Sequence, residues 1–317
     1  MWALFFTVKS RIHCLVITLL LVLHSAYATA SEASAQRRWG TGSSIKSEIL
    51  IASLSADDEL EAATSHYEEG NYEDAIGAFG RIILGTVPAS QSQRNEALLG
   101  RAKLFLVISQ PQLALSDLGL IQYPANAFSD NAQLNLVKGV AFIQAKQYAQ
   151  AVAHLTRAEK AMEPNAMLLS NRAVAYQSLG RYELARQDLE ASLRLERAEP
   201  TLYNLAVLEK FAGQYQRCVS ILSGLIAERK SNPAVFQERG VCLARLGQVD
   251  AAIGDLLKAL AINQANPPVL EELGALLAQK GDKDGARRYF ESAASFYLQA
   301  GATAEYTRVL GKIEQLR

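Results

Sequence analysis

The stretch YQSLGRYELARQDLEASLRL, residues 176–195, contains the spacing on which the fold of this chain depends. Gly180 is followed five residues later by Ala185 and nine residues later by Leu189. Glycine adopts the left-handed backbone conformation without steric cost, so Gly180 can end one helix and let the next begin. Ala185 and Leu189 are four residues apart and therefore share one face of the second helix. The stretch predicts two helices joined by a tight turn.

The same spacing returns along the chain at nearly regular intervals. The turn position falls at Gly70, Ser109, Lys146, Gly180, Gly213, Gly247 and Gly281. A small residue stands seven places before every turn position, at Ala63, Ala102, Gly139, Ala173, Ala206, Gly240 and Gly274. Small residues let the two helices of a pair approach closely, and each pair leaves an apolar face that only the next pair can cover. The pattern therefore predicts a stack of helix pairs.

This repeat resembles the tetratricopeptide repeat over residues 56–296, and the best unit is NRAVAYQSLGRYELARQDLEASLRL, residues 171–195. The resemblance implies an all-α fold, a right-handed α-solenoid of about six to seven helix-turn-helix repeats. The second and third units are irregular, because they contain extra residues and have Ser109 and Lys146 at the turn position. After a break at Gly301, residues 297–317 end in an expected C-terminal capping helix with its charged residues facing outward.

The N-terminal segment has the pattern of a secretory signal. Lys9 and Arg11 precede the apolar run Cys14–Leu23, and small residues with A-x-A spacing follow up to Ala30. The apolar run is shorter than the roughly 20 residues of a membrane-spanning helix. We expect residues 1–30 to be a signal peptide, residues 31–55 a linker, and the mature chain to reach the periplasm or the extracellular space. An uncleaved membrane anchor is the alternative.

Charge and motifs argue against several function classes. The chain has 32 basic and 32 acidic residues, and loss of residues 1–30 would leave 30 basic and 32 acidic residues. This balance does not favour nucleic acid as a partner. The sequence contains no Gly-rich phosphate loop, HExxH or CxxC motif, so we expect no catalytic residues, cofactor or metal. The many acidic residues are interpreted as solvated helix faces. The alternatives are a groove-based enzyme or small-ligand-binding protein, and an RNA-binding helical repeat protein.

The resemblance places the first helix of each pair in a concave groove. Nine groove residues are candidates for binding a partner: Asn171, Val174, Tyr203, Asn204, Val207, Lys210, Gln237, Glu238 and Arg245. Some relatives hold a C-terminal carboxylate with several Lys and Arg residues, but most aligned residues here are neutral or acidic. The hypothesis is a non-catalytic protein–protein interaction scaffold or adaptor of the cell envelope, which binds a peptide or helix in pilus, secretion or envelope assembly. A purely structural role for the two asparagines is the alternative.

Two further features leave alternatives open. Cys218 lies in the second helix of one unit and Cys242 in the first helix of the next, so the pair can form a disulfide or remain two small buried residues. The second interpretation is favoured, because Cys218 replaces a packing alanine. Eight acidic residues from Asp57 to Asp74 precede the first base of that unit, Arg81. They can contact a basic partner or form a soluble end of the array, and the second is favoured.

Overall fold

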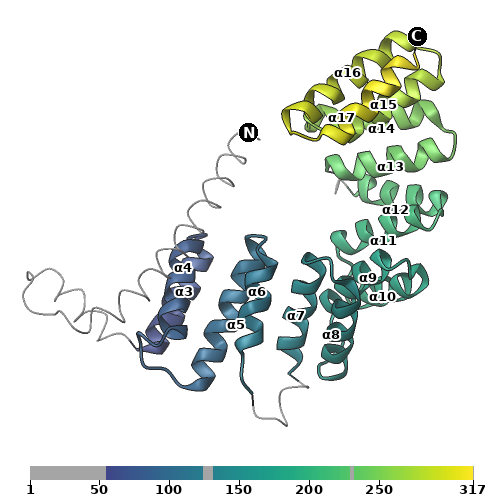
Figure 1. Cartoon of the computed structure of the whole chain (residues 1–317). Coiled ribbons are helices and arrows are strands. Elements are labelled where there is room, and N and C mark those ends of the chain that lie inside the picture. The colour runs from purple at the N-terminus through teal and green to yellow at the C-terminus, as the bar shows by residue number, and fades with distance from the viewer. Residues whose placement is uncertain (1–54, 124–130, 229–231, 317) are drawn as a thin grey trace, which may run out of the picture. The chain divides into compact units, whose positions relative to one another are not determined.

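The computed structural model describes residues 55–123, 131–228 and 232–316 (Figure 1). The predicted signal peptide, and the predicted linker up to residue 54, lie outside the described residues. The described part of the chain contains fifteen helices and no strand. The helices are α3 (Ala56–Glu68), α4 (Tyr72–Ile83), α5 (Gln91–Val107), α6 (Pro111–Leu120), α7 (Ala132–Gln144), α8 (Tyr148–Lys160), α9 (Ala166–Ser178), α10 (Tyr182–Leu195), α11 (Glu199–Phe211), α12 (Tyr215–Ala227), α13 (Pro233–Arg245), α14 (Val249–Ile262), α15 (Pro267–Gln279), α16 (Lys283–Gln299) and α17 (Thr303–Glu314).

Tight turns with positive φ join the two helices of each pair, as the spacing predicts. Every predicted turn position has a positive φ, from 59° at Ser109 and Lys146 to 86° at Gly281. Ser109 and Lys146 adopt this conformation at a cost of roughly 1–2 kcal/mol each, because their Cβ crowds the backbone. The neighbouring contacts of the repeat therefore impose the turn even where glycine is absent.

Asparagine and proline set the starts of the first helices. The N-cap side chains of Asn131, Asn165, Asn232 and Asn266 accept hydrogen bonds from backbone N–H groups in the first turns of α7, α9, α13 and α15. Such a cap satisfies one of the backbone donors that a helix start leaves unpaired. Proline occupies the first or second position of α6, α11, α13 and α15, where its missing N–H costs nothing.

The predicted small residues lie at the contact between the two helices of a pair. Ala173 and Ala185 are 1% and 0% exposed and share one cluster with Leu189. The same contact in the last pair uses glycine, and a Cβ added to Gly274 would lie 2.7 Å from the ring of Phe290. The helices thus approach as closely as the small side chains permit, and the larger residue fills the remaining space.

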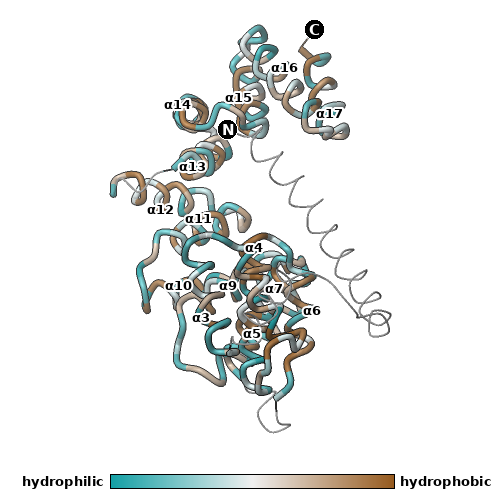
Figure 2. The backbone as a smooth tube through the Cα atoms, turned by 90° about the vertical axis from the view of Figure 1, so that its left-hand side faces the viewer, coloured by the Kyte–Doolittle hydropathy of each residue, from teal (hydrophilic) through white to brown (hydrophobic). Residues whose placement is uncertain are grey.

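The helices form two layers. Each first helix contacts the second helix of its own pair and the first helices of neighbouring pairs, from α3 and α5 to α13 and α15. Each second helix also contacts the first helix of the next pair, as α10 contacts α11. Figure 2 shows hydrophobic and hydrophilic stretches alternating along the helices, as expected when one face of each helix is buried. The first helices therefore make one continuous layer of neighbouring surfaces.

Buried ion pairs recur in alternate helix pairs. The second, fourth and sixth pairs each contain an arginine and an aspartate 16 residues apart: Arg101–Asp117, Arg172–Asp188 and Arg239–Asp255. Each pair makes two hydrogen bonds, and the three aspartates are only 3% to 8% exposed. The interpretation of the acidic residues as solvated was wrong here and also for the buried residues Glu59, Glu209 and Glu271. An ionised carboxylate can be buried at these positions because a guanidinium compensates its charge.

The C-terminal helix α17 covers the end of the array. The chain turns at Gly301, whose φ is 69°, and Val309 of α17 is buried in a cluster with Phe290 of α16. The prediction that the charged residues of this helix face outward was wrong for two of them. Arg308 and Lys312 both donate hydrogen bonds to Glu271 of α15, at 2.9 Å and 2.6 Å, because that buried carboxylate needs compensating charge.

Candidate protein-interaction surface

The nine candidate residues lie on three neighbouring first helices. Asn171 and Val174 belong to α9, and α13 carries Gln237, Glu238 and Arg245. The remaining four, Tyr203, Asn204, Val207 and Lys210, belong to α11, which contacts both α9 and α13. Eight of the nine are partly buried, and Arg245 is exposed. The repeat thus brings all nine into one layer, which we call the candidate surface.

Two asparagines form the centre of the candidate surface. Asn171 and Asn204 occupy the same repeat position, nine residues before Gly180 and Gly213. In the described part of the chain, neither side-chain amide makes a hydrogen bond, so local backbone does not occupy these groups as it does at the N-caps. Each amide offers two donor hydrogens and one acceptor oxygen. Both amides are therefore available to a bound group.

Valines lie beside the two asparagines. Val174 and Val207 follow Asn171 and Asn204 by three residues, a spacing that puts each valine next to its asparagine on the helix surface. Val241 continues the row on α13, and all three valines are only partly buried. The candidate surface therefore combines amides that can hydrogen-bond with an apolar strip that can accept side chains.

Lys210 and Glu238 tie two of these helices together. The Nζ atom of Lys210 lies 2.6 Å from Oε2 of Glu238, and the two side chains are only 20% and 13% exposed. The ammonium also lies 4.8 Å from the centroid of the Phe211 ring. Because Glu238 compensates the charge of Lys210, this lysine does not offer a free cation to a partner carboxylate. This pairing agrees with the expectation that the surface lacks a carboxylate clamp.

Tyr203 keeps its phenolic proton over the physiological pH range. Burial and the negative charge of Glu238 raise the pKa of Tyr203 to about 12, because both disfavour the phenolate. The protonated hydroxyl can donate a hydrogen bond as well as accept one. Tyr203 therefore adds a polar tip and an aromatic ring to the surface beside Asn204.

The remaining two candidate residues differ from each other. Gln237 accepts a hydrogen bond of 2.8 Å from the amide of Asn266, the N-cap of α15, and so connects α13 to the following pair. Arg245 forms no ion pair with any described residue. Gln237 has a structural contact, whereas Arg245 is the candidate cation that remains uncompensated in the described chain.

The sequence interpretation missed two exposed apolar residues on the same helices. Met167 of α9 and Phe211 of α11 are 56% and 55% exposed. Met167 precedes Asn171 by four residues, and Phe211 follows Val207 by four, so each is next to a candidate residue along its helix. The sequence signal was the four-residue spacing. It could have been found by listing the large apolar residues that the repeat does not require for packing.

The acidic first pair is partly explained by internal contacts. Glu59 is 1% exposed, and its carboxylate accepts two hydrogen bonds from Arg81, at 2.6 Å and 2.7 Å. Asp57 accepts a hydrogen bond from Gln93 of the next pair at 2.7 Å. Other members of the run, including Glu61 and Glu68, are exposed. Glu59 and Asp57 thus have structural contacts, and a basic partner is not needed to explain them.

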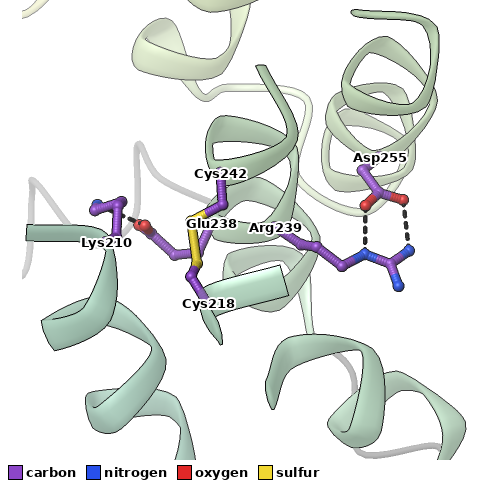
Figure 3. Close-up of a disulfide and its surroundings, with 6 residues drawn as sticks. All are labelled: Lys210, Cys218, Glu238, Arg239, Cys242 and Asp255. Carbon is purple, nitrogen blue, oxygen red and sulfur yellow. Dashed lines mark hydrogen bonds and ion pairs between the residues drawn. A yellow bond between two sulfur atoms is a disulfide. The ribbon is translucent and has the colours of Figure 1, made fainter. Parts of the chain in front are cut away.

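Cys218 and Cys242 form a disulfide (Figure 3). The bond joins α12 to α13 across a Cα–Cα distance of 6.5 Å, and both residues are 0% exposed. The favoured interpretation, two separate small residues, was wrong. Both cysteines do replace small packing residues, but the contact between a second helix and the next first helix brings these two positions within disulfide range.

Side chains suited to catalysis or metal binding do not converge in the described residues. No three of the His, Cys, Asp and Glu residues described are grouped so that they could hold a metal ion. Nδ1 of His154 lies 2.8 Å from Oδ1 of Asn135, which is not a nucleophile. Burial and the nearby charges of Arg157 and Lys138 lower the pKa of His154 to about 4, so its ring is neutral near pH 7. Among the described helices, none is both long and apolar enough to cross a membrane.

The stacked pairs and their continuous first-helix layer define an α-helical repeat protein. Residues 168–199 match the family model described as "Tetratricopeptide repeat". The chain is therefore a tetratricopeptide repeat protein, and its fold is a right-handed α-solenoid. Such repeats generally serve as scaffolds that bind other proteins along their extended surface.

Solved structures with similar folds agree. A tetratricopeptide repeat protein from Parabacteroides merdae ATCC 43184 has a TM-score of 0.64 and 16% identity, over 80% of this chain and 98% of that one. A chain of the APC/C hetero-tetramer Cut9-Hcn1 has a TM-score of 0.56 and 16% identity, over 84% of this chain and 58% of that one. No curated protein matches the chain. At such low identity the similarity concerns the fold alone.

Proposed function

We propose that the protein is a non-catalytic adaptor that binds an extended segment of a partner protein across α9, α11 and α13. The observation that carries this proposal is the pair of unoccupied amides at Asn171 and Asn204. A protein that needed these asparagines only for its own fold would bond them to its own backbone, as it does at Asn165.

The chemistry of the surface suits an extended peptide. A peptide backbone presents alternating N–H and C=O groups, and a side-chain amide can pair with both. Val174 and Val207 offer apolar area to the side chains of the bound segment, and burying such area is favourable by roughly 25 cal/mol per Å². Because Glu238 compensates Lys210, the surface does not favour a free C-terminal carboxylate. An internal segment of the partner fits these groups better.

We also propose that the protein works outside the cytoplasm, in the cell envelope. The basic start, the short apolar run and the A-x-A sites of residues 1–30 support export, although these residues lie outside the described structure. The disulfide supports the same proposal independently, because disulfides persist in oxidising compartments. Pilus, secretion and envelope assemblies are settings that need such adaptors. Sequencing the N-terminus of the native protein tests this, because export predicts a start at Thr29 or Ser31, and recovery of Met1 contradicts cleavage.

The binding proposal is tested by site-specific cross-linking followed by titration. A photo-reactive amino acid at position 204 should capture a partner in envelope extracts, whereas the same group at Gln216, an exposed residue on the second helix α12, should not. With the captured partner in hand, Asn171→Ala and Asn204→Ala should each weaken binding by roughly two- to tenfold, the value of one net hydrogen bond. The double variant should lose about the product of the two factors.

Three results would count against this assignment. Capture from position 216 but not from 204 would move the interaction to the second helices. Unchanged affinity in a folded double variant would show that the amides do not contact the partner. Loss of helicity in either single variant would instead support a structural role for that asparagine.

A further inference from the structure

The joint between the fifth and sixth helix pairs is closed by a covalent bond. Cys218 lies in the first turn of α12, and Cys242 lies near the end of α13. The bond closes a loop across a sequence separation of 24 residues. No ion pair joins α12 to α13 in the described residues, and one hydrogen bond of 3.0 Å runs from Arg239 to Ser223. The disulfide is therefore the strongest single tie at this joint.

Charged contacts perform the same task at the two preceding joints. Arg172 of α9 donates to Glu159 of α8, and Arg186 of α10 donates to Glu209 of α11. The fifth pair has no arginine–aspartate pair of its own, because Leu205 and Ile221 occupy the equivalent positions. The disulfide thus stands where the array uses the least charge to hold its helices together.

The bond is also connected to the candidate surface. Cys242 follows Glu238 by four residues, one helical turn, and Glu238 is the partner of Lys210 on α11. Figure 3 shows the disulfide between the Lys210–Glu238 pair and the Arg239–Asp255 pair. Any movement of α13 against α12 therefore shifts Glu238 relative to Lys210.

We propose that the Cys218–Cys242 disulfide is a redox-dependent lock on the joint between α12 and α13, closed in an oxidising compartment and opened by a dithiol reductant. A thiolate of the dithiol attacks one cysteine sulfur, the bond between the two cysteines breaks, and the other cysteine leaves as a thiolate. The second thiol of the reductant then displaces the first cysteine and becomes part of a new disulfide. Two electrons pass from the dithiol to the cysteines, which take up two protons and end as thiols.

Reduction loosens the joint for two physical reasons. Two non-bonded thiols need more room than one disulfide, and both sulfurs lie in residues that are fully buried, so the helices must separate slightly. The closed loop also restricts how far α12 and α13 can move apart, and this restriction disappears with the bond. Where the proposed function holds, opening the lock separates α11 from α13 and weakens partner binding.

Hydrogen exchange of the oxidised and the dithiothreitol-reduced protein tests the lock without any partner. We expect amides of α12 and α13 to exchange roughly tenfold faster or more after reduction, while amides of α9 and α10 in the same molecule do not change. Alkylation and mass spectrometry of the peptides that contain each cysteine verify the redox state. The matched variant is Cys218→Ala with Cys242→Ala, because alanine occupies the equivalent positions at Ala185 and Ala175. It should exchange like the reduced protein and ignore the reductant.

Equal exchange of the oxidised and reduced wild-type protein would overturn the lock, and so would faster exchange spread evenly over α9 and α10. Alkylation of both cysteines in the native, unreduced protein would show that the bond is absent. Failure of the proposed function has a different signature. Asn171→Ala with Asn204→Ala would then bind normally while the exchange of α12 and α13 still responded to reduction.

Discussion

Removing the charge of Arg172 should destabilise the array far more than removing an exposed arginine. Arg172 and Asp188 are 7% and 8% exposed, and two hydrogen bonds of 2.8 Å join them. The hydrogen bonds and the charge of Asp188 raise the pKa of Arg172 above its ordinary value, so the pair stays ionised at any pH where the protein folds. Arg172→Leu leaves Asp188 buried without its partner, which costs about 3–5 kcal/mol.

The fifth helix pair supplies the matched second change. Leu205 and Ile221 occupy its equivalent positions, so Arg172→Leu with Asp188→Ile replaces the ion pair by an apolar pair that the fold already uses. We expect this double variant to lie within about 1 kcal/mol of the wild type, because no uncompensated charge remains and only the half-exposed tie to Glu159 is lost. The coupling between the two positions should therefore be about 3 kcal/mol.

Urea denaturation followed by circular dichroism measures these differences. An array of repeats need not unfold in one step, so hydrogen exchange of α9 and α10 should accompany the midpoints. Arg197→Leu is the control, because its exposed pair with Glu228 should be worth no more than about 1 kcal/mol. If the double variant is as unstable as Arg172→Leu alone, the lost arginine stem, and not the unpaired carboxylate, carries the cost, and the reasoning fails.

Two further predictions concern neighbouring pairs. Ala173→Leu should overpack the contact with Ala185 and cost roughly 1–3 kcal/mol, and an unchanged melting curve would contradict the assigned repeat position. His154 has a folded-state pKa of about 4, below the usual 6.5, so the unfolded chain binds its proton first as the pH falls. The stability from this neutral histidine is complete above pH 6.5 and declines toward pH 4, and His154→Gln should flatten that part of the stability profile. Equal pH profiles for the variant and the wild type would show that other groups set the slope.

The sequence predicted the turns because their chemistry is local. Glycine at Gly180 is itself a turn signal, and the repeat extends that signal to Ser109 and Lys146, where no local preference exists. The buried ion pairs were missed for the opposite reason. An acidic residue in a helix does not reveal whether it faces water or a neighbouring helix, and Asp188 resembles any exposed aspartate when read alone. The available signal was the constant separation between each of these aspartates and an arginine earlier in the chain.

The candidate surface was predictable only in part. The repeat position places Asn204 and Lys210 on the same helix, and this followed from the sequence. The pairing of Lys210 with Glu238 did not, because it depends on the distance between two helices. The disulfide depends on the same information, since Cys218 and Cys242 meet only through the packing of consecutive pairs. Contacts between repeats were therefore the limit of the sequence interpretation.

The alternation of ion pairs gives the array a period of two helix pairs. Arg101, Arg172 and Arg239 occupy one repeat position in alternate pairs, and the pairs between them have no arginine at that position. Deleting one helix pair would put two pairs of the same kind next to each other. Deleting residues 172–238 would instead set Arg239 in the place of Arg172 and keep the alternation intact. The natural module for shortening or extending this protein is thus a double repeat, and chains that gain or lose one module should fold better than chains changed by half of it.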